Sequence, residues 1–344
     1  MRRNEGVAVR DVPACPLCEA QGRELYRDLR DRYWDAPGTW GFLECPRCRH
    51  IWLNPLPEPE DIPKLYGSYY THRPPVPTDV SPSRALAIRA AFVGLGYDSA
   101  ALTSVDRQVA WWLRHVPPLW DAFAREARFL PASPGGILLD VGCGEGSFLR
   151  RMGDLGWRVV GLEPDPRAAA VARSGSGADI IEGPIEGTDL GRARFDAITM
   201  IHVIEHVRDP IAALRAVCSA LKPGGTFAAL TPNAEGRGHR VFGSAWFHLD
   251  PPRHLHLFRS RNLRSVAERA GLSVKRLWTS PLDALRVHHV SAALRARGRF
   301  DLRDMSWAPT LRDRAFRIAE YGIAAVRREA GEEIVLIATK GEAA

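Results

Sequence analysis

A glycine-rich turn between a buried strand and a helix constrains this chain more than any other feature. The stretch 135–148 reads GGILLDVGCGEGSF, and its apolar run Ile137–Val141 predicts a buried parallel strand. Gly142, Gly144 and Gly146 follow at alternate positions, before apolar residues recur at helical spacing. Glycines let a backbone approach a ligand where a Cβ would clash, and a helix N-terminus offers unpaired N–H groups to an anion. The stretch therefore predicts a cofactor cradle in an α/β domain.

The spacing of the glycines indicates which cofactor the cradle holds. A dinucleotide fingerprint needs G-x-G-x-x-G, but here the third glycine comes one residue early and Ser147 stands where a glycine is expected. The D-x-G-x-G-x-G pattern instead resembles motif I of class I S-adenosylmethionine (SAM) methyltransferases. An acidic residue about 20 positions further on should bind the ribose hydroxyls. The resemblance implies SAM-binding residues Asp140, Gly142, Gly144, Gly146 and Glu163, the last directly after a predicted strand at 157–162. A bare glycine turn in a nucleotide-free domain is the alternative.

Strands and helices alternate from residue 131 onward, which is typical of a doubly wound parallel sheet. Further strands are predicted at 179–181, 195–201, 226–230, 272–278 and 333–339, with helices at 166–174, 209–221 and 260–270. We expect a seven-stranded Rossmann-like sheet of the class I methyltransferase type, whose last strand runs antiparallel. Residues 281–331 would form a helical insertion before that strand, with helices near 283–297 and 310–329.

Four of the six cysteines form two C-x-x-C knuckles near the N-terminus. Cys15 and Cys18 are separated from Cys45 and Cys48 by residues 19–44. Four thiolates spaced in this way can converge on one tetrahedral zinc, which replaces a core too small to fold alone. Four thiolates leave no open position, so we expect a structural zinc, with His50 as a spare candidate ligand. Two disulfides are the alternative, which a cytosolic setting disfavours.

The composition along the chain indicates three regions. Residues 1–53 are the zinc-ribbon-like module, 54–130 a Pro/Tyr-rich linker with helices, and 131–344 the SAM-dependent methyltransferase domain. The linker is expected to hold one short helix near 61–66, and Pro117-Pro118 should break the helical stretch 84–130. Tyr66, Tyr69 and Tyr70 could cover the SAM pocket as a lid or could staple the linker to the core.

Two groups of polar residues follow predicted strands at the edge where SAM should bind. Methyl transfer requires alignment of the reacting atoms and often a base that removes a proton from the acceptor. His202, Glu205 and His206 follow strand 195–201 and should face the methionine end of SAM; Glu205 and His206 could instead form a hydrogen-bonded pair. The loop 242–258 should form a wall of the acceptor pocket. Imidazole accepts protons near neutral pH, so His254 is our candidate base, with His256 and His248 behind it.

Several motifs make the whole chain resemble a broad bacterial group of methyltransferases related to the ubiquinone-biosynthesis O-methyltransferases. These motifs are LKPGG at 221–225, TPN at 231–233, Trp246 and PRHL at 252–255. The resemblance implies O-methylation and a possible divalent cation at Glu205 and His206, although His202 replaces the first acid of the group's E-x-x-E-H stretch. Pro184 replaces the aspartate that often binds adenine, so this contact is expected from the backbone near Ile185 or from Glu186.

The net charge and the hydropathy of the chain limit the classes of partner that it can bind. The chain has 344 residues and a net charge of +7 without a long basic run, which permits nucleic-acid binding but does not argue for it. No apolar h-region or membrane-length stretch is present, so we expect a cytoplasmic protein, monomeric or homodimeric. A hydroxyl of a sugar or secondary metabolite is the expected acceptor. An RNA methyltransferase that grips its substrate with the zinc ribbon is one alternative, and a non-catalytic SAM-binding scaffold is another.

Overall fold

A seven-stranded sheet forms the centre of the computed structural model, which describes residues 2–67, 81–98, 103–302, 307–327 and 329–341. The strand order is β13-β14-β11-β10-β7-β8-β9. Their bounds are β7 Ile137–Val141, β8 Arg158–Glu163, β9 Asp179–Glu182, β10 Phe195–Ile201, β11 Leu221–Pro232, β13 Leu272–Ser280 and β14 Glu333–Lys340. β14 pairs antiparallel with both β11 and β13, and the other pairings are parallel. The class I methyltransferase sheet predicted from the sequence is confirmed.

Helices cover both faces of this sheet because its strands are apolar on both sides. The helices between the strands are α4 Ser147–Asp154, α5 Pro166–Ser176, α6 Pro210–Ala220 and α8 Ser260–Arg269. Leu139 and Ile198 pack with α6 and α8 in one apolar cluster, whereas their neighbours Leu138 and Ala197 pack with α4 on the other side. This alternation follows the two-residue period of a strand.

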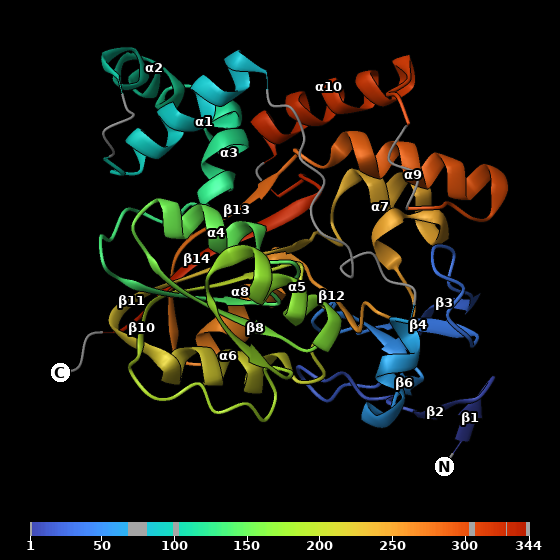
Figure 1. Ribbon diagram of the computed structural model, residues 1–344. Helices are drawn as coiled ribbons and strands as arrows, with labels where there is room; N and C mark the ends of the chain where they lie inside the picture. Colours follow the sequence, from blue (N-terminus) through green and yellow to red (C-terminus); the bar gives the residue numbers. More distant parts are fainter. Residues whose placement is uncertain (1, 68–80, 99–102, 303–306, 328, 342–344) are drawn as a thin grey trace.

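Additional helices lie on the α4 side of the sheet, along the upper edge of Figure 1. They are α1 Pro82–Gly94, α2 Ser104–Arg114, α3 Pro117–Ala124 and the 3₁₀ turn η3 Arg125–Ala127. The sequence predicted that Pro117 breaks the helical stretch. In the structure Pro117 is also the first residue of a new helix, α3. A proline fits there because its missing N–H is one that a first helical turn leaves unbonded.

Two small antiparallel sheets make up the N-terminal region. One has the order β1-β2-β6 and the other the order β12-β5-β4-β3. Their bounds are β1 Arg2–Asn4, β2 Val7–Arg10, β3 Arg23–Leu29, β4 Trp40–Glu44, β5 Ile51–Asn54, β6 Leu56–Pro57 and β12 His256–Leu257, with the 3₁₀ helix η1 at Pro59–Leu65. β12 belongs to the loop 242–258, so the predicted acceptor loop completes the sheet of the four-cysteine region.

The insertion before β14 contains two helices, as predicted: α9 Ala284–Arg297 and α10 Leu311–Val326. Asp313 caps α10 and accepts hydrogen bonds from His288 and His289 of α9, which fixes the two helices against each other. The loop after β11 holds the short helices α7 Arg237–Phe242, η4 Gly243–Ala245 and η5 Phe247–Leu249. Among the described residues, every helix falls short of the length and apolarity needed to cross a bilayer.

Candidate active site

The glycine loop after β7 has the backbone that its sequence predicts. Gly142 and Gly146 have φ angles of +69° and +82°, which residues with a Cβ rarely adopt. A Cβ at Gly142 would lie 2.4 Å from the side chain of Val203, and one at Gly146 would lie 3.1 Å from Ala172. The loop can therefore be built only with glycine at these positions, and it opens directly into α4.

Glu163 ends the neighbouring strand β8 and holds this loop in place. Its carboxylate accepts hydrogen bonds from the backbone N–H groups of Gly144, at 2.9 Å, and Asp165, at 3.0 Å. The side chain is buried, and burial raises its pKa above the usual value. Glu163, which is predicted to bind the ribose, is thus in direct contact with the glycine loop.

Asp140, the acid of motif I, lies fully buried below the loop. Its Oδ1 accepts a hydrogen bond of 2.7 Å from Thr199 and forms an ion pair with Arg128, whereas its Oδ2 has no protein partner. A buried carboxylate oxygen without a donor is costly, so this atom fits a ligand that brings a positive charge. The α-ammonium group of SAM has that charge.

Arg128 was not predicted from the sequence. It follows η3 in a left-handed conformation, with φ +51°, and its guanidinium lies over the ring of Phe148, 3.5 Å from the centroid. It also donates a hydrogen bond of 2.9 Å to Thr199. The chain has many arginines, and no motif distinguishes Arg128 from the others, so the sequence gave no signal for it.

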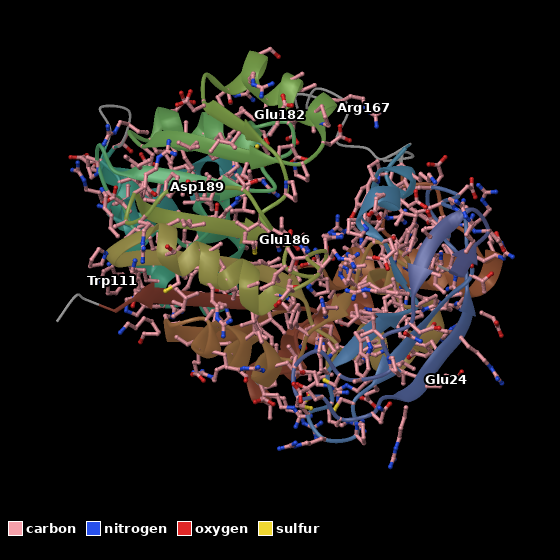
Figure 2. The ribbon with its side chains drawn as sticks, turned by 90° about the horizontal axis from the view of Figure 1, so that it is seen from below. Glu24, Trp111, Arg167, Glu182, Glu186 and Asp189 are labelled. Atoms are coloured by element: carbon pink, nitrogen blue, oxygen red, sulfur yellow. The ribbon has the colours of Figure 1, made fainter. Side chains whose placement is uncertain are left out.

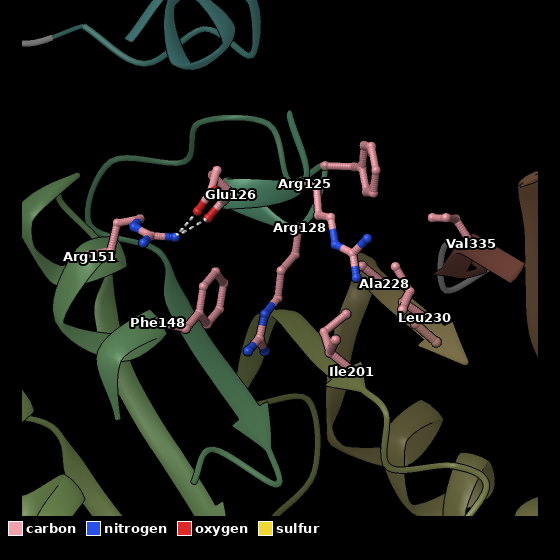
Figure 3. A pocket seen from close by; sticks show the side chains of 11 residues that line it. Arg125, Glu126, Arg128, Phe148, Arg151, Ile201, Ala228, Leu230 and Val335 are labelled. Carbon is pink, nitrogen blue, oxygen red and sulfur yellow. Dashed lines mark hydrogen bonds and ion pairs between the residues drawn. The ribbon is translucent and has the colours of Figure 1, made fainter. Parts of the chain in front are cut away.

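A cavity of about 210 Å³ lies between η3 and the sheet (Figure 3). Three arginines line its walls, but each forms an ion pair: Arg125 with Glu333, Arg128 with Asp140, and Arg151 with Glu126. Its apolar wall comprises Phe129, Phe148, Ile201, Ala228, Ala229, Leu230 and Val335. The cavity is therefore amphipathic, with paired charges at one side and the carboxyl end of β10 at the other.

The residues expected near adenine lie after β9. Ile185 is buried, and its side chain packs in the main apolar cluster. The Glu186 carboxylate accepts a hydrogen bond of 2.8 Å from the backbone N–H of Arg208. A carboxylate can accept further hydrogen bonds, so the adenine contact remains a prediction for the backbone near Ile185 or for Glu186.

His202 follows β10 and lies between two carboxylates. Its Nδ1 is 3.3 Å from Oε1 of Glu205, and its Nε2 is 3.0 Å from Oε1 of Glu333. Glu333 also accepts two hydrogen bonds from Arg125, and Thr231 donates one of 2.9 Å to Glu205. The carboxylate of Glu205 thus takes its hydrogen bonds from His202 and Thr231, which does not support the interpretation of Glu205 as a partner of His206.

This network sets the charge of its members. Burial alone would lower the pKa of His202, but the hydrogen bonds and charges of Glu205 and Glu333 raise it to about 9. Burial alone would raise the pKa of Glu205, but His202 and the neighbouring imidazoles lower it to about 2. At neutral pH the structure therefore holds an imidazolium between two carboxylates, at the point predicted for the methionine end of SAM.

Glu205, His206 and His254 come together although 47 residues separate the last two before folding. One ligand atom of each lies within 4.8 Å of the others, and the two imidazole rings are 4.7 Å apart. Nδ1 of His206 donates to the carbonyl of Arg253 at 2.9 Å, and Nδ1 of His254 donates to the carbonyl of His248 at 2.7 Å. These bonds fix the tautomer, so each Nε2 carries a lone pair.

Burial lowers the pKa of both imidazoles, that of His206 to about 4. Both rings are therefore neutral at pH 7 and can accept a proton or bind a cation through Nε2. The hydroxyl of Tyr66 lies 3.2 Å from Nδ1 of His206, so this linker residue contacts the cluster. Tyr69 and Tyr70, the other tyrosines of the predicted lid, lie outside the described residues.

A buried ion cluster fixes the loop that carries His254. Arg253 is fully buried and donates to both carboxylate oxygens of Asp31, at 2.7 and 2.9 Å, and also to Asp250. Next to it, His256 of β12 lies 3.0 Å from His50. The other two histidines of the loop therefore have structural positions: His256 in the N-terminal sheet and His248 beside Asp283 at 3.1 Å.

The four N-terminal cysteines also come together. The distances between Sγ atoms are 3.6 Å for Cys15 and Cys48, 3.4 Å for Cys18 and Cys45, and 3.6 Å for Cys18 and Cys48. Four thiolates around one zinc with Zn–S bonds of 2.3 Å would be about 3.8 Å apart. The set therefore fits a tetrahedral zinc, while His50 bonds to His256 instead.

Comparisons with known proteins agree with this geometry. Residues 112–277 match a methyltransferase-domain family. The ubiquinone biosynthesis O-methyltransferase of Methylobacterium sp. (strain 4-46) is 32% identical over 163 residues, 41% of this chain and 66% of the relative, just under two thirds of its length. The corresponding enzyme of Cereibacter sphaeroides (strain ATCC 17025 / ATH 2.4.3) is 32% identical over 182 residues, 46% of this chain and 74% of the relative.

A crystal structure of a SAM-dependent methyltransferase from Mesorhizobium loti aligns over 63% of this chain and 97% of its own, with a TM-score of 0.44 and 18% identity. The sequence matches, together with the strand order and the glycine loop, show that the chain belongs to the class I SAM-dependent methyltransferases.

Proposed function

We propose that this enzyme transfers the methyl group of SAM to a hydroxyl of a small molecule, such as a sugar or a phenolic metabolite. The proposal is supported above all by the buried cluster of Glu205, His206 and His254 at the carboxyl ends of the strands. It lies beside the cofactor loop, where ligands of open α/β sheets bind. The cluster combines a permanent negative charge with two neutral imidazoles, which suits an acceptor that must lose a proton.

On the cofactor side, each residue meets a different part of SAM, whose sulfonium supplies an electrophilic methyl group. Gly142, Gly144 and Gly146 leave room for the chain of the ligand, and Glu163 would bind the ribose hydroxyls. Oδ2 of Asp140 would accept from the α-ammonium group because it has no protein donor. Arg128 would bind the carboxylate of SAM, since its guanidinium already lies beside Asp140, where it pairs with Oδ1.

On the acceptor side, His254 would be the base. Its Nδ1–H is held by the carbonyl of His248, so Nε2 is the atom that would take the proton of the acceptor hydroxyl as the oxygen attacks the methyl group. The resulting imidazolium would be stabilised by Glu205 and Asp250, whose carboxylates raise its pKa against the effect of burial. His206 is the next candidate base, because it also has a ring nitrogen within 4.8 Å of the Glu205 carboxylate.

A divalent cation at Glu205, His206 and His254 is the alternative to acid–base chemistry. Two imidazole nitrogens with their Nδ1–H groups on backbone carbonyls, together with a carboxylate, resemble the donor sets of metal sites. His202 could not join this set, because both its ring nitrogens face carboxylates. A bound cation would be detected by elemental analysis of the purified protein and lost in His254→Ala. A zinc at the four cysteines would persist.

The test is turnover of SAM with a panel of catechols, phenols and monosaccharides. Formation of S-adenosylhomocysteine and of the methylated hydroxyl compound is expected. His254→Ala should lower kcat by roughly 10²-fold or more, as loss of a general base does. His115→Ala serves as the matched control, because that histidine is exposed at the end of α2 and its ring, among the described residues, hydrogen-bonds only to the carbonyl of Trp111. Methylation of RNA with no transfer to any hydroxyl compound would favour the RNA methyltransferase alternative.

A further inference from the structure

Exposed apolar side chains are concentrated on the helices added to the sheet. Nine large hydrophobic side chains are exposed among the described residues, and only Val241 lies elsewhere. The other eight are Val105, Trp111 and Trp112 of α2, Val116 and Leu119 at the start of α3, and Leu311, Ile318 and Val326 of α10. We call these eight residues the apolar face. A soluble surface normally scatters such residues, so their concentration calls for a partner.

The spacing aligns exposed residues along one side of α10 and, apart from Trp111, along one side of α2. Leu311, Ile318 and Val326 are seven and eight residues apart, and Ile318 and Val326 are 71% and 85% exposed. Val105 and Trp112 are likewise seven residues apart on α2. Such intervals form a stripe along a helix. In Figure 1, α2 and α10 lie along the same upper edge of the molecule, on either side of α1 and α3.

The exposed charged residues of α2 and α10 have one sign. Its helices carry the exposed arginines Arg107, Arg312, Arg314 and Arg317. The acidic residues of α2 and α10 are instead buried: Asp106 and Asp313 cap their helices, and Glu320 faces Arg237. The described outer surface of the two helices is therefore apolar and basic.

We propose that the apolar face docks this enzyme on the surface of an anionic lipid bilayer. Tryptophan and aliphatic side chains flanked by arginines are the combination by which amphipathic helices lie in a membrane interface. Arginines near anionic headgroups strengthen such attachment. A second copy of the chain would instead bring two sets of arginines together. A nucleic acid would leave the exposed Leu, Ile and Val side chains without an apolar partner. The proposal does not depend on the identity of the acceptor.

The test is co-sedimentation of the full chain with vesicles of phosphatidylcholine containing 30% phosphatidylglycerol, compared with pure phosphatidylcholine. Binding to the anionic vesicles is expected, with a decrease of at least tenfold for the double variant Trp111→Ser/Trp112→Ser. Arg314→Gln/Arg317→Gln should weaken binding to anionic vesicles by roughly fivefold or more, in line with the contribution of each arginine. Val241→Ser is the matched control and should bind like the wild type.

Equal melting temperatures would show that the variants fold, since all the replaced side chains are exposed. The proposal would be overturned by wild-type protein that stays in the supernatant with both kinds of vesicle. It would also be overturned by binding that neither double variant reduces. Self-association or RNA binding that depends on Trp111 and Trp112, without vesicle binding, would assign the apolar face to a second copy or to a nucleic acid instead.

Discussion

The cofactor end and the acceptor end proposed for this active site are built in different ways. At the cofactor end, the two groups that touch, Gly144 and Glu163, are 19 residues apart in the chain. At the acceptor end, Arg253 bonds to Asp31 across 222 residues, and His50 lies against His256 across 206. One βαβ unit thus supplies the glycine loop and Glu163 of the proposed SAM cradle, whereas the loop with His254 is held by the N-terminal four-cysteine region.

The difference teaches where substrate specificity can change. A cradle within one unit depends on local glycines and on the start of one helix, so it tolerates changes elsewhere in the chain. The acceptor wall depends on β12 pairing with β5 and on a buried ion cluster contributed by distant segments. Damage to the N-terminal region should therefore reach the acceptor end and spare the cofactor end.

Zinc removal should separate the two ends most strongly. In Cys45→Ser, or after chelation, the four-cysteine region should be destabilised, because its two C-x-x-C knuckles lose the metal that would join them. The melting temperature should fall by roughly 5–10 °C, as expected for the loss of a few kcal/mol. SAM affinity should stay within about threefold of the wild type. Cys218→Ser, at a cysteine outside the cluster, is the control. The structural role would be refuted if wild-type protein had the same melting temperature with and without zinc.

Breaking the buried ion cluster should have the next largest effect. Arg253→Ala leaves Asp31 and Asp250 without their shared cation in a buried site. Removal of one partner of a buried ion pair typically costs about 3–5 kcal/mol, so the free energy of unfolding should fall by that amount in urea. The exposed pair of Arg30 and Glu5 provides the comparison, since Arg30→Ala should change little. Equal effects of the two substitutions would mean that the acceptor loop is not held by Arg253.

The pH dependence of stability should reveal the network that joins the two ends. The pKa of His202 is raised to about 9 in the folded protein, above the 6.5 of a free imidazole. Its contribution is therefore complete below about pH 6.5 and is lost as the pH rises through about 9. The loss should be about 1–3 kcal/mol in wild type and absent in His202→Gln. Parallel curves for the two proteins between pH 6.5 and 9.5 would show that His202 is not charged at neutral pH.

The same comparison explains what could be predicted from the sequence. The period of apolar residues and the glycine spacing are local signals, so they predicted all seven strands of the sheet, the glycine loop and the place of Glu163 at the end of β8. The two C-x-x-C knuckles are also local, and their four Sγ atoms come together as expected.

The residues that contact these groups were harder to predict from the sequence. Arg128 reaches Asp140 only because η3 ends in a left-handed residue, and Arg253 finds Asp31 only through the pairing of β12 with β5. No periodicity records such contacts. The histidines of the loop 242–258 could be recognised as candidates, but their separate places, His254 in the cluster and His256 in the N-terminal sheet, depend on tertiary packing. In Figure 2, Glu24 of β3 in the N-terminal region and Trp111 of α2 lie on opposite sides of the molecule.

Calorimetric titration of SAM into matched variants tests the division of the site most directly. Glu163→Ala should weaken SAM binding by roughly tenfold or more, because charge-assisted hydrogen bonds to the ribose and the support of Gly144 are both lost. Glu163→Gln, which keeps the shape of the side chain, should fall between this variant and the wild type. His254→Ala should bind SAM like the wild type. Unchanged affinity in Glu163→Ala, or an equal loss in His254→Ala, would contradict the account of separate cofactor and acceptor ends.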